Sequence, residues 1–273
     1  MKRQPESNNI PMVAAAFSAQ AIYFDEIYSS NKIIRYKRER VRNRLLTYLK
    51  PNSHILELNA GTGEDAIFLA SQGYQVHATD NADGMLKRLR QKIKLAGLEA
   101  SISSESCSFT SLENLQNKGP FDCVFSNFAG LNCTGELKLV LESFDGLLKP
   151  GGIVLMVLLP KFCLWESLLL LRGNFKTAFR RFLSYRGRKA KIDQAEFRCW
   201  YYNPGFVRNI LKDKFSFLAL EGLCTFVPPS YIGSFPEKHP KSYLWLQKTE
   251  DKLNNKWPWH SIGDYYIISF RKN

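Results

Sequence analysis

Apolar runs and amphipathic segments alternate along the chain between residues 54 and 160. The apolar runs are short and nearly continuous, which is typical of strands covered on both faces of a parallel sheet. The segments between them carry apolar residues at helical spacing. The pattern predicts strands at 54–59, 74–79, 121–127 and 151–160, a weak strand near 100–104, and helices at 64–73, 85–97 and 134–148. We therefore expect a doubly wound α/β domain.

The regular alternation stops after Pro160. Residues 161–192 look like an insertion of two helices between the fifth and sixth strands. Asn203 and Pro204 are residue types that favour a helix N-cap and first position, so a helix is expected to begin there. The remaining pattern predicts a sixth strand at 215–227, a helix around 241–253 and a last strand at 264–271.

Composition restricts the class of protein. The hydrophobic fraction of 45% is ordinary for a globular domain. No run approaches the ~20 apolar residues of a membrane span, so we expect a soluble protein. The six cysteines form no C-x-x-C pair and the four histidines have no metal-ligand spacing, which predicts reduced thiols, no metal and a cytoplasmic location. The apolar stretch Met12–Phe17 is too short for a secretory signal, and we interpret the start as a loose tail that enters a helix.

The net charge of +13 is concentrated in two segments. Residues 32–50 carry eight basic residues and Glu39, and residues 161–198 carry ten basic and three acidic residues, so that each segment has a net charge of +7. Such clusters can face phosphate, an anionic membrane or an acidic substrate. For the first segment we favour a solvated amphipathic helix face, with Val41 and Leu45 among the residues packed inward.

A glycine turn carries the strongest chemical signal. Residues 61–66, Gly-Thr-Gly-Glu-Asp-Ala, match the dinucleotide pattern G-x-G-x-x-[GA], and Asp80 ends the next predicted strand. Glycines let the backbone approach a ligand, and an acidic residue can accept hydrogen bonds from ribose hydroxyls. A P-loop is excluded because no Gly-Lys-Ser/Thr follows the turn. A nicotinamide dinucleotide and S-adenosylmethionine both remain open from this motif alone.

Three further features, taken in order with this turn, resemble one family. Glu57 extends the turn to E-x-N-x-G-x-G, the fourth strand reads "FDCVFSN", and "LKPGG" introduces the fifth. Together they resemble class I S-adenosylmethionine-dependent methyltransferases of the small-molecule, quinone-biosynthesis type, over about residues 33–160. The resemblance implies a seven-stranded, mostly parallel Rossmann-like sheet with an antiparallel last strand and a helical lid at about 161–192. It also implies a cytoplasmic enzyme that uses S-adenosyl-L-methionine.

Position by position, the resemblance implies a cofactor site. The loop residues would lie under the methionine and ribose, with Glu57 supporting the turn, Asp80 on the ribose hydroxyls and Asn81 beside the adenine. The implied cofactor residues are Glu57, Asn59, Ala60, Gly61, Gly63, Asp80, Asn81, Ser108, Phe109 and Asn127. Two of them depart from the family. Asn59 replaces a glycine but tolerates positive φ, and Ser108 replaces an aspartate but can still accept a hydrogen bond.

The acceptor is less well defined. Residues 1–32 resemble the N-terminal segment that closes the site in such enzymes, with 33–273 as the methyltransferase domain, and Tyr23, Tyr28 and Phe128 are candidate pocket residues. A stripe of apolar residues at 175–183 predicts either a lid over an apolar or aromatic metabolite, with peripheral membrane contact through 161–192, or ordinary packing. The alternatives are an RNA or protein methyltransferase, although we do not expect nucleic acid, or a non-catalytic cofactor-binding protein. No catalytic residue or oligomeric state is predicted, and His239, His260 and Asp264 are interpreted as structural.

Overall fold

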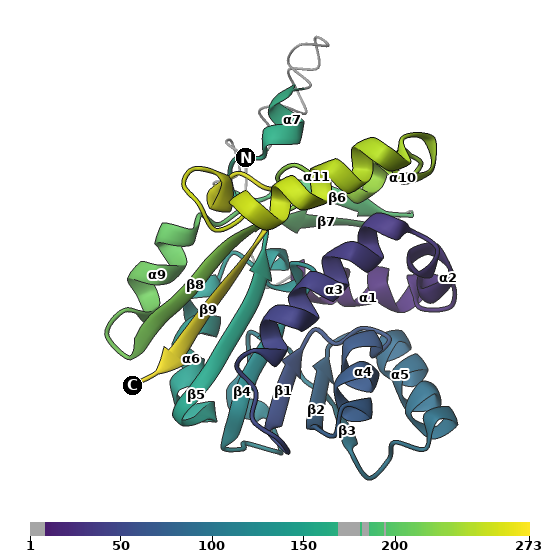
Figure 1. Cartoon of the computed structure of the whole chain (residues 1–273). Helices are drawn as coiled ribbons and strands as arrows, with labels where there is room; N and C mark the ends of the chain where they lie inside the picture. The colour runs from purple at the N-terminus through teal and green to yellow at the C-terminus, as the bar shows by residue number, and fades with distance from the viewer. Residues whose placement is uncertain (1–8, 169–180, 182–185, 194) are drawn as a thin grey trace.

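The computed structural model describes residues 9–168, 181, 186–193 and 195–273 (Figure 1). A seven-stranded sheet in the order β3-β2-β1-β4-β5-β9-β8 forms the centre of the molecule. Only β9 runs antiparallel to its neighbours β5 and β8. The strands are β1 His54–Leu58, β2 Gln75–Asp80, β3 Ile102–Ser106, β4 Phe121–Ser126, β5 Leu148–Leu158, β8 Phe215–Leu223 and β9 Tyr265–Lys272. The predicted doubly wound sheet with an antiparallel last strand is confirmed.

Helices cover both faces of this sheet because neighbouring residues of each strand point in opposite directions. In β1, Ile55 packs in a core cluster with Val41 and Leu69, whereas Leu56 packs in a second cluster with Phe144. The first face is covered by α3 Lys32–Leu46, α4 Glu64–Ser71 and α5 Asp83–Ala96. The second is covered by α6 Leu137–Leu147 and α9 Pro204–Leu211. Continuous apolar strands were therefore a correct indication of burial on both faces.

The remaining elements gather at the carboxyl ends of the parallel strands (Figure 1). They are α1 Asn9–Gln20, α2 Phe24–Ser29, α7 Leu164–Leu168, α10 Phe235–Lys238 and α11 Pro240–Leu253, with β6 Arg188–Ile192 and β7 Ala195–Cys199. Short 3-10 helices lie at Leu112–Asn114, Gly130–Cys133, Ser230–Ile232 and Trp259–Ser261. Because the loops that follow β1, β2 and β4 open at this edge, these elements enclose the functional side of the sheet.

The insertion after β5 differs from the expectation. We expected helices through residue 192, but β6 and β7 form an antiparallel hairpin in which Arg188 pairs with Cys199 and Ile192 with Ala195. In β6, Lys189 and Lys191 alternate with Ala190 and Ile192, a period-two pattern that was the available signal for a strand. The apolar stripe at 175–183 lies outside the described residues except for Arg181. Helix α7 is the described helical part of the insertion.

The N-terminal part of the chain is packed against the fold from Asn9, the first described residue, onward. The Asn9 side chain donates to the carbonyl of Cys133 (2.7 Å) and accepts from the backbone N–H of Arg198 (2.7 Å). Ala16 is buried with Cys133 and Phe197 in a small apolar cluster. Helix α1 thus connects the hairpin to the loop after β4.

An ion cluster anchors the insertion to β9. The Arg181 guanidinium donates to Glu166 Oε1 (2.6 Å) and Asp264 Oδ1 (2.7 Å), and all three side chains are buried. Cys163, Glu166 and Asp264 also place ligand-type atoms within 4.8 Å of one another. Because the Arg181 guanidinium already donates to both carboxylates, we interpret this cluster as a structural ion cluster. The ion pair with Arg181 supports a structural interpretation of Asp264.

Two broader expectations can be compared with the structure. None of the six cysteines, all of which are described, forms a disulfide, and all but Cys199 are buried. Among the described residues, the helices are too short or too polar to cross a lipid bilayer.

Candidate active site

A cavity of about 250 Å³ lies at the carboxyl ends of β1, β2 and β4. The strand order reverses between β1 and β4, and such a switch point is where ligands bind in open α/β sheets. One side of the cavity is formed by the loops after these strands, and the other by α1, α2 and α3. Residues far apart in sequence therefore enclose a single space.

The loop after β1 has the backbone conformation that the glycine motif predicts. Asn59, Gly61 and Gly63 all have positive φ, at 48°, 57° and 83°. A side chain at Gly61 would meet no atom within 4 Å, but its φ still favours glycine. The expectation that Asn59 would tolerate the left-handed conformation is confirmed.

Asn59 also connects this loop to the end of β4. Its amide donates to the carbonyl of Asn127 (3.0 Å), and its Oδ1 accepts from the hydroxyl of Ser126 (2.6 Å). A Cβ on Gly130 would lie only 2.3 Å from Asn59 Cγ, so Gly130 leaves room for the asparagine. Asn59, which replaces the usual glycine of the family, is thus accommodated by Gly130 in the 3-10 helix after β4.

Asp80 holds the loops after β1 and β2 together at the edge of the cavity. Its two carboxylate oxygens accept from the backbone N–H of Gly61 (2.8 Å) and of Ala82 (2.8 Å). Burial raises the pKa of Asp80, while these backbone hydrogen bonds oppose the increase. A carboxylate has about four lone-pair sites, so Asp80 can still accept a hydroxyl group from a ligand.

Four charged or ionisable residues lie together beside α3, namely buried Glu57 and Asp65 and half-buried Arg38 and Arg42. Asp65 accepts from Arg38 (3.0 Å), from Arg42 (2.7 Å) and from the Asn127 amide (2.8 Å). Burial acts to raise the pKa of Asp65, but the two arginines and Asn127 outweigh it and the pKa is lowered. Burial, and then the charge of Asp65, raise the pKa of Glu57 well above its usual range. The surroundings therefore favour the ionised form of Asp65 and the protonated form of Glu57.

Aromatic rings and cations meet where β4 ends. Phe128 has a positive φ of 50°, and the guanidinium of Arg38 lies 4.7 Å from the centroid of its ring. The ammonium of Lys37 lies 4.4 Å from the ring centroid of Tyr265 and donates to Ser230 Oγ (3.1 Å). Lys37 is only 1% exposed. Cations over ring faces stabilise this wall electrostatically.

Most of the predicted site residues line this cavity. Ten of them do so, namely Glu57, Asn59, Ala60, Gly61, Asp80, Asn81, Phe109, Asn127, Tyr28 and Phe128. Three do not line it: a Cβ on Gly63 would contact Leu89, Ser108 Oγ pairs with the hydroxyl of Thr110, and the Tyr23 hydroxyl donates to Asp193. Gly63 instead serves as the N-cap of α4.

Sequence reasoning missed a second set of lining residues. They come from α1, α3, α5 and β9 and include Ile10, Val13, Ala14, Phe17, Arg38, Met85 and Tyr265. The apolar stretch at 12–17 was the available signal, but we interpreted it as part of a tail. In α3, the sequence "KIIRYKRER" gives no local indication of which basic side chains point into the protein and which point into water.

Comparisons with known proteins agree with the observed fold and with the glycine motif in the loop after β1. Residues 55–152 match the sequence family described as a methyltransferase domain. The demethylmenaquinone methyltransferase of Bacteroides fragilis is 32% identical over 115 residues, which are 41% of this chain and 46% of that protein. The chain thus spans less than half the length of the curated relative that it matches.

Solved structures show the same fold over a larger part of the chain. The 1,6-didemethyltoxoflavin-N1-methyltransferase of Burkholderia thailandensis, solved with 1,6-didemethyltoxoflavin and S-adenosylhomocysteine, has a TM-score of 0.59 at 14% identity. The alignment covers 100% of this chain and 92% of that one. The [4+2]-cyclase SpnF has a TM-score of 0.54 at 17% identity, with 85% and 80% covered. The chain has the class I S-adenosylmethionine-dependent methyltransferase fold, and residues 55–152 carry the matched domain.

The lining residues fit the cofactor that this fold implies. The buried Oε2 of Glu57 has no hydrogen-bond partner among the described residues, and Asp80 retains free lone pairs for a ribose. Ala82, Met85 and Phe109 provide apolar surface for a flat base, and Arg38 provides a cation for a carboxylate. S-adenosylmethionine carries each of these groups.

Proposed function

We propose that this protein is an enzyme that transfers a methyl group from S-adenosylmethionine to a small, apolar or aromatic metabolite. The supporting observation is the division of one cavity into two chemically different sides. Polar groups from the ends of β1, β2 and β4 form one side, and apolar and aromatic residues from α1 and α2 form the other. A polar cofactor and an apolar acceptor would meet between them.

The cofactor side would be formed by the loop after β1, with Asp80 on the ribose hydroxyls and Asn81 and Phe109 beside the base. Asn127 would lie near the reactive end, because its backbone and side chain are fixed by Asn59 and Asp65. When bound, the cofactor supplies an electrophilic methyl group on a sulfonium. A role for Ser108 at the adenine has weaker support, since its hydroxyl pairs with Thr110.

The acceptor side would be formed by the N-terminal segment and the end of β4. Val13, Phe17, Phe24, Tyr28 and Phe128 all line the cavity. The N-terminal segment is thus proposed to be part of the acceptor pocket, with residues 33–273 as the methyltransferase domain. Tyr23 is proposed to support the acceptor pocket indirectly, because its hydroxyl donates to Asp193 after β6.

Catalysis would depend on alignment and on exclusion of water. A lone pair of the acceptor forms the new bond to the methyl carbon as the carbon–sulfur bond breaks, and any proton on the nucleophile leaves for solvent or a base. Holding reactants in attack geometry can contribute ~7–11 kcal/mol. The apolar side chains of α1 and α2 would keep water from the reacting atoms. Neither His239 nor His260 lines the cavity.

The RNA or protein methyltransferase alternative has less support. Much of the basic charge on α3 is already paired within the protein, because Arg38 and Arg42 bind Asp65 and Arg44 binds Glu221. Paired and half-buried guanidiniums are poor phosphate contacts. The demethylmenaquinone methyltransferase relative, by its name, acts on a quinone-type molecule, which agrees with an apolar acceptor.

Two measurements test the proposal. Calorimetry with S-adenosylhomocysteine should show one site per chain, and Asp80→Ala should weaken binding about ten- to a hundred-fold through loss of charge-assisted hydrogen bonds. Turnover with donor labelled in the methyl group, across cell extracts fractionated by polarity, should label a compound in an apolar fraction.

The outcomes separate the alternatives. Label in RNA or protein would favour the macromolecular acceptor. Tight binding without transfer into any fraction would favour a non-methylating use of the fold, as in the cyclase neighbour. Absence of binding at millimolar ligand would contradict the cofactor site itself.

A further inference from the structure

Helix α11 presents a surface of aromatic, apolar and basic side chains that the active site does not use. Tyr243 and Glu250 are its buried residues, and Tyr243 packs against Tyr36 of α3. On the outer side, Leu244 is 57% and Trp245 is 64% exposed. We define the α11 surface as these two exposed residues together with Lys241, Lys248 and Lys252. No residue of α11 lines the active-site cavity.

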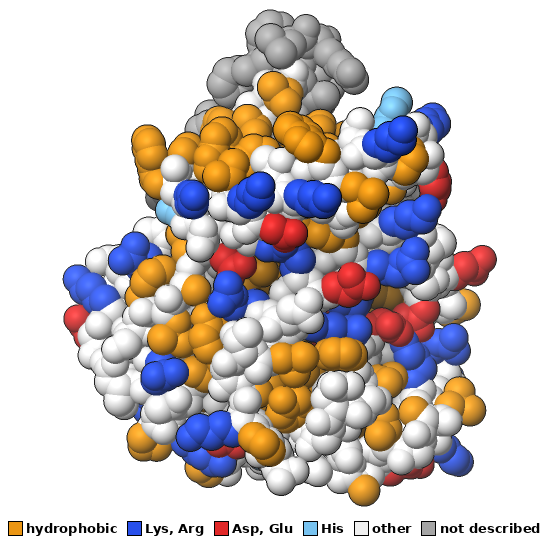
Figure 2. All heavy atoms as spheres, viewed as in Figure 1, with side chains coloured by type: hydrophobic (Ala, Val, Ile, Leu, Met, Phe, Trp, Pro, Cys, Tyr) orange, Lys and Arg blue, Asp and Glu red, His pale blue; other side chains and the backbone are white. Residues whose placement is uncertain are grey.

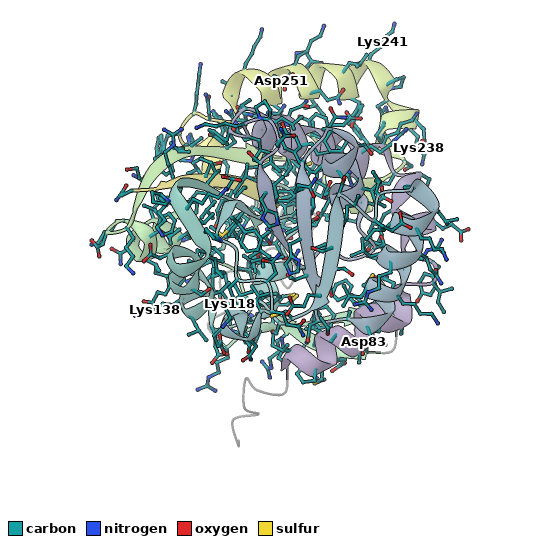
Figure 3. The ribbon with its side chains drawn as sticks, turned by 90° about the horizontal axis from the view of Figure 1, so that it is seen from below. Asp83, Lys118, Lys138, Lys238, Lys241 and Asp251 are labelled. Carbon is teal, nitrogen blue, oxygen red and sulfur yellow. The ribbon has the colours of Figure 1, made fainter. Side chains whose placement is uncertain are left out.

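The residues of the α11 surface lie on neighbouring turns of one helix. Residues three, four or seven positions apart share a helix face, so Lys241, Trp245 and Lys248 form a stripe with Leu244 beside it. Figure 2 shows hydrophobic side chains gathered over α11 with a row of Lys and Arg side chains along their lower edge. Figure 3 shows Lys241 and Lys238 at the periphery of the molecule. Trp257, which follows the helix closely, is 82% exposed.

The acidic residues of this region do not neutralise the lysines. The buried carboxylate of Glu250 accepts from the backbone N–H groups of Thr225, Phe226 and Val227, at 3.0, 2.8 and 2.9 Å. Asp251 binds Arg40 of α3. By contrast, Lys238, Lys241, Lys248, Lys252 and Lys256 form no ion pair with any described residue. The α11 surface therefore has a positive charge without an internal partner.

We infer that the α11 surface docks on an anionic lipid bilayer. An exposed tryptophan suits the headgroup level of a membrane, where its ring is apolar and its N–H remains hydrated. Lysine stems can cover apolar surface while the ammonium groups bind anionic headgroups. A protein partner fits less well, because lysine is depleted in the cores of protein interfaces. This inference does not depend on the proposed methyltransferase activity, and it involves a different segment from 161–192.

Sedimentation of the full chain with vesicles tests this surface. The protein should bind vesicles of equal phosphatidylcholine and phosphatidylglycerol and should remain in solution with phosphatidylcholine alone. The variant Lys241→Gln/Lys248→Gln should lower the partition coefficient about 30-fold, since each lysine near an anionic surface contributes about five-fold. Higher ionic strength should weaken binding of the natural chain.

Matched control variants lie on the other side of the molecule. Lys118 and Lys138 are far from α11 in Figure 3, so Lys118→Gln/Lys138→Gln removes the same charge elsewhere. Leu139 is 52% exposed on α6, which makes Leu139→Ser the control for Leu244→Ser. Both control variants should bind vesicles like the natural chain, whereas Leu244→Ser should bind more weakly.

A second measurement reports insertion of the aromatic ring. Lipids brominated near the headgroup should quench part of the tryptophan fluorescence, and Trp245→Phe should remove much of that quenching while vesicles are still bound. Equal binding to both kinds of vesicle, absence of binding, or equal loss in the α11 and control variants would each overturn the inference. Recovery of a stoichiometric protein complex through Trp245 with no vesicle binding would instead indicate a protein partner.

Discussion

Helices α3 and α11 are both basic and pack against each other, but their cations differ in whether they pair with carboxylates of the protein. Arg38 and Arg42 of α3 point toward buried Asp65, whereas Lys241 and Lys248 of α11 have no carboxylate partner among the described residues. Arg40 of α3 connects the two helices by binding Asp251. The comparison shows that the charge of a segment does not determine whether its cations are paired within the protein.

The difference follows from how much of each helix is enclosed. Helix α3 buries six residues, including Lys37, because the sheet lies on one side and the Ser230 segment on another. Helix α11 buries only Tyr243 and Glu250, so most of its side chains face water. Buried cations need partners, whereas exposed cations remain hydrated.

The largest expected effect comes from removing the partner of the α3 cations. Asp65→Asn should lower the free energy of unfolding by about 3–5 kcal/mol, because Arg38 and Arg42 would be left without their carboxylate. Urea denaturation measures this change. In the matched variant Asp251→Asn, the lost carboxylate is 60% exposed although its partner Arg40 is half-buried, and the change should stay below about 1 kcal/mol. Equal losses in the two variants would contradict the distinction between the helices.

A smaller effect on the free energy of unfolding comes from Glu57, whose contribution depends on pH. Because its pKa is raised in the folded state, Glu57 contributes stability below its usual pKa, and this contribution is lost as pH rises through the folded pKa. Glu57→Gln should therefore be more stable than the natural chain at neutral pH. The contribution of Asp65 to stability has the opposite pH dependence. Because its pKa is lowered in the folded state, Asp65 stabilises the fold above its usual pKa, and this contribution is lost on acidification.

Thermal denaturation of both forms at acidic and neutral pH measures this second effect. The difference between Glu57→Gln and the natural chain should grow as pH increases from the usual glutamate range. A constant difference across that range would show that Glu57 is ionised in the folded protein.

The next effect tests the buried amine of α3. Lys37→Met keeps an unbranched side chain, one atom shorter, but removes an ammonium that has no carboxylate partner among the described residues. Replacement of a buried charge by an apolar group of similar size is often neutral or stabilising, so we expect a gain of up to about 1 kcal/mol in unfolding free energy. A loss larger than that would mean that Ser230 and the ring of Tyr265 stabilise the ammonium more than burial destabilises it.

The smallest effect is expected on α11. Lys248→Gln should change the free energy of unfolding by less than about 0.5 kcal/mol, because the lysine is exposed and unpaired. Its affinity for S-adenosylhomocysteine should equal that of the natural chain. A clear change in either property would mean that α11 is coupled to the active site.

Local sequence signals predicted much of the sheet and one side of the candidate site. The strands, the positive φ of Asn59 and the position of Asp80 follow from short-range features, namely apolar runs, glycine spacing and the end of a strand. These features restrict the backbone within a few residues, so they can be interpreted without knowledge of distant partners.

Only the tertiary structure decided which distant residues complete the site. The β6–β7 hairpin, the apolar side formed by α1, the pairing of Arg38 with Asp65 and the close fit of Gly130 against Asn59 all join segments that are remote in sequence. A hydrophobic or charged residue shows that a partner is needed, but not which partner it finds. That choice depends on packing and burial, which exist only once the chain has folded.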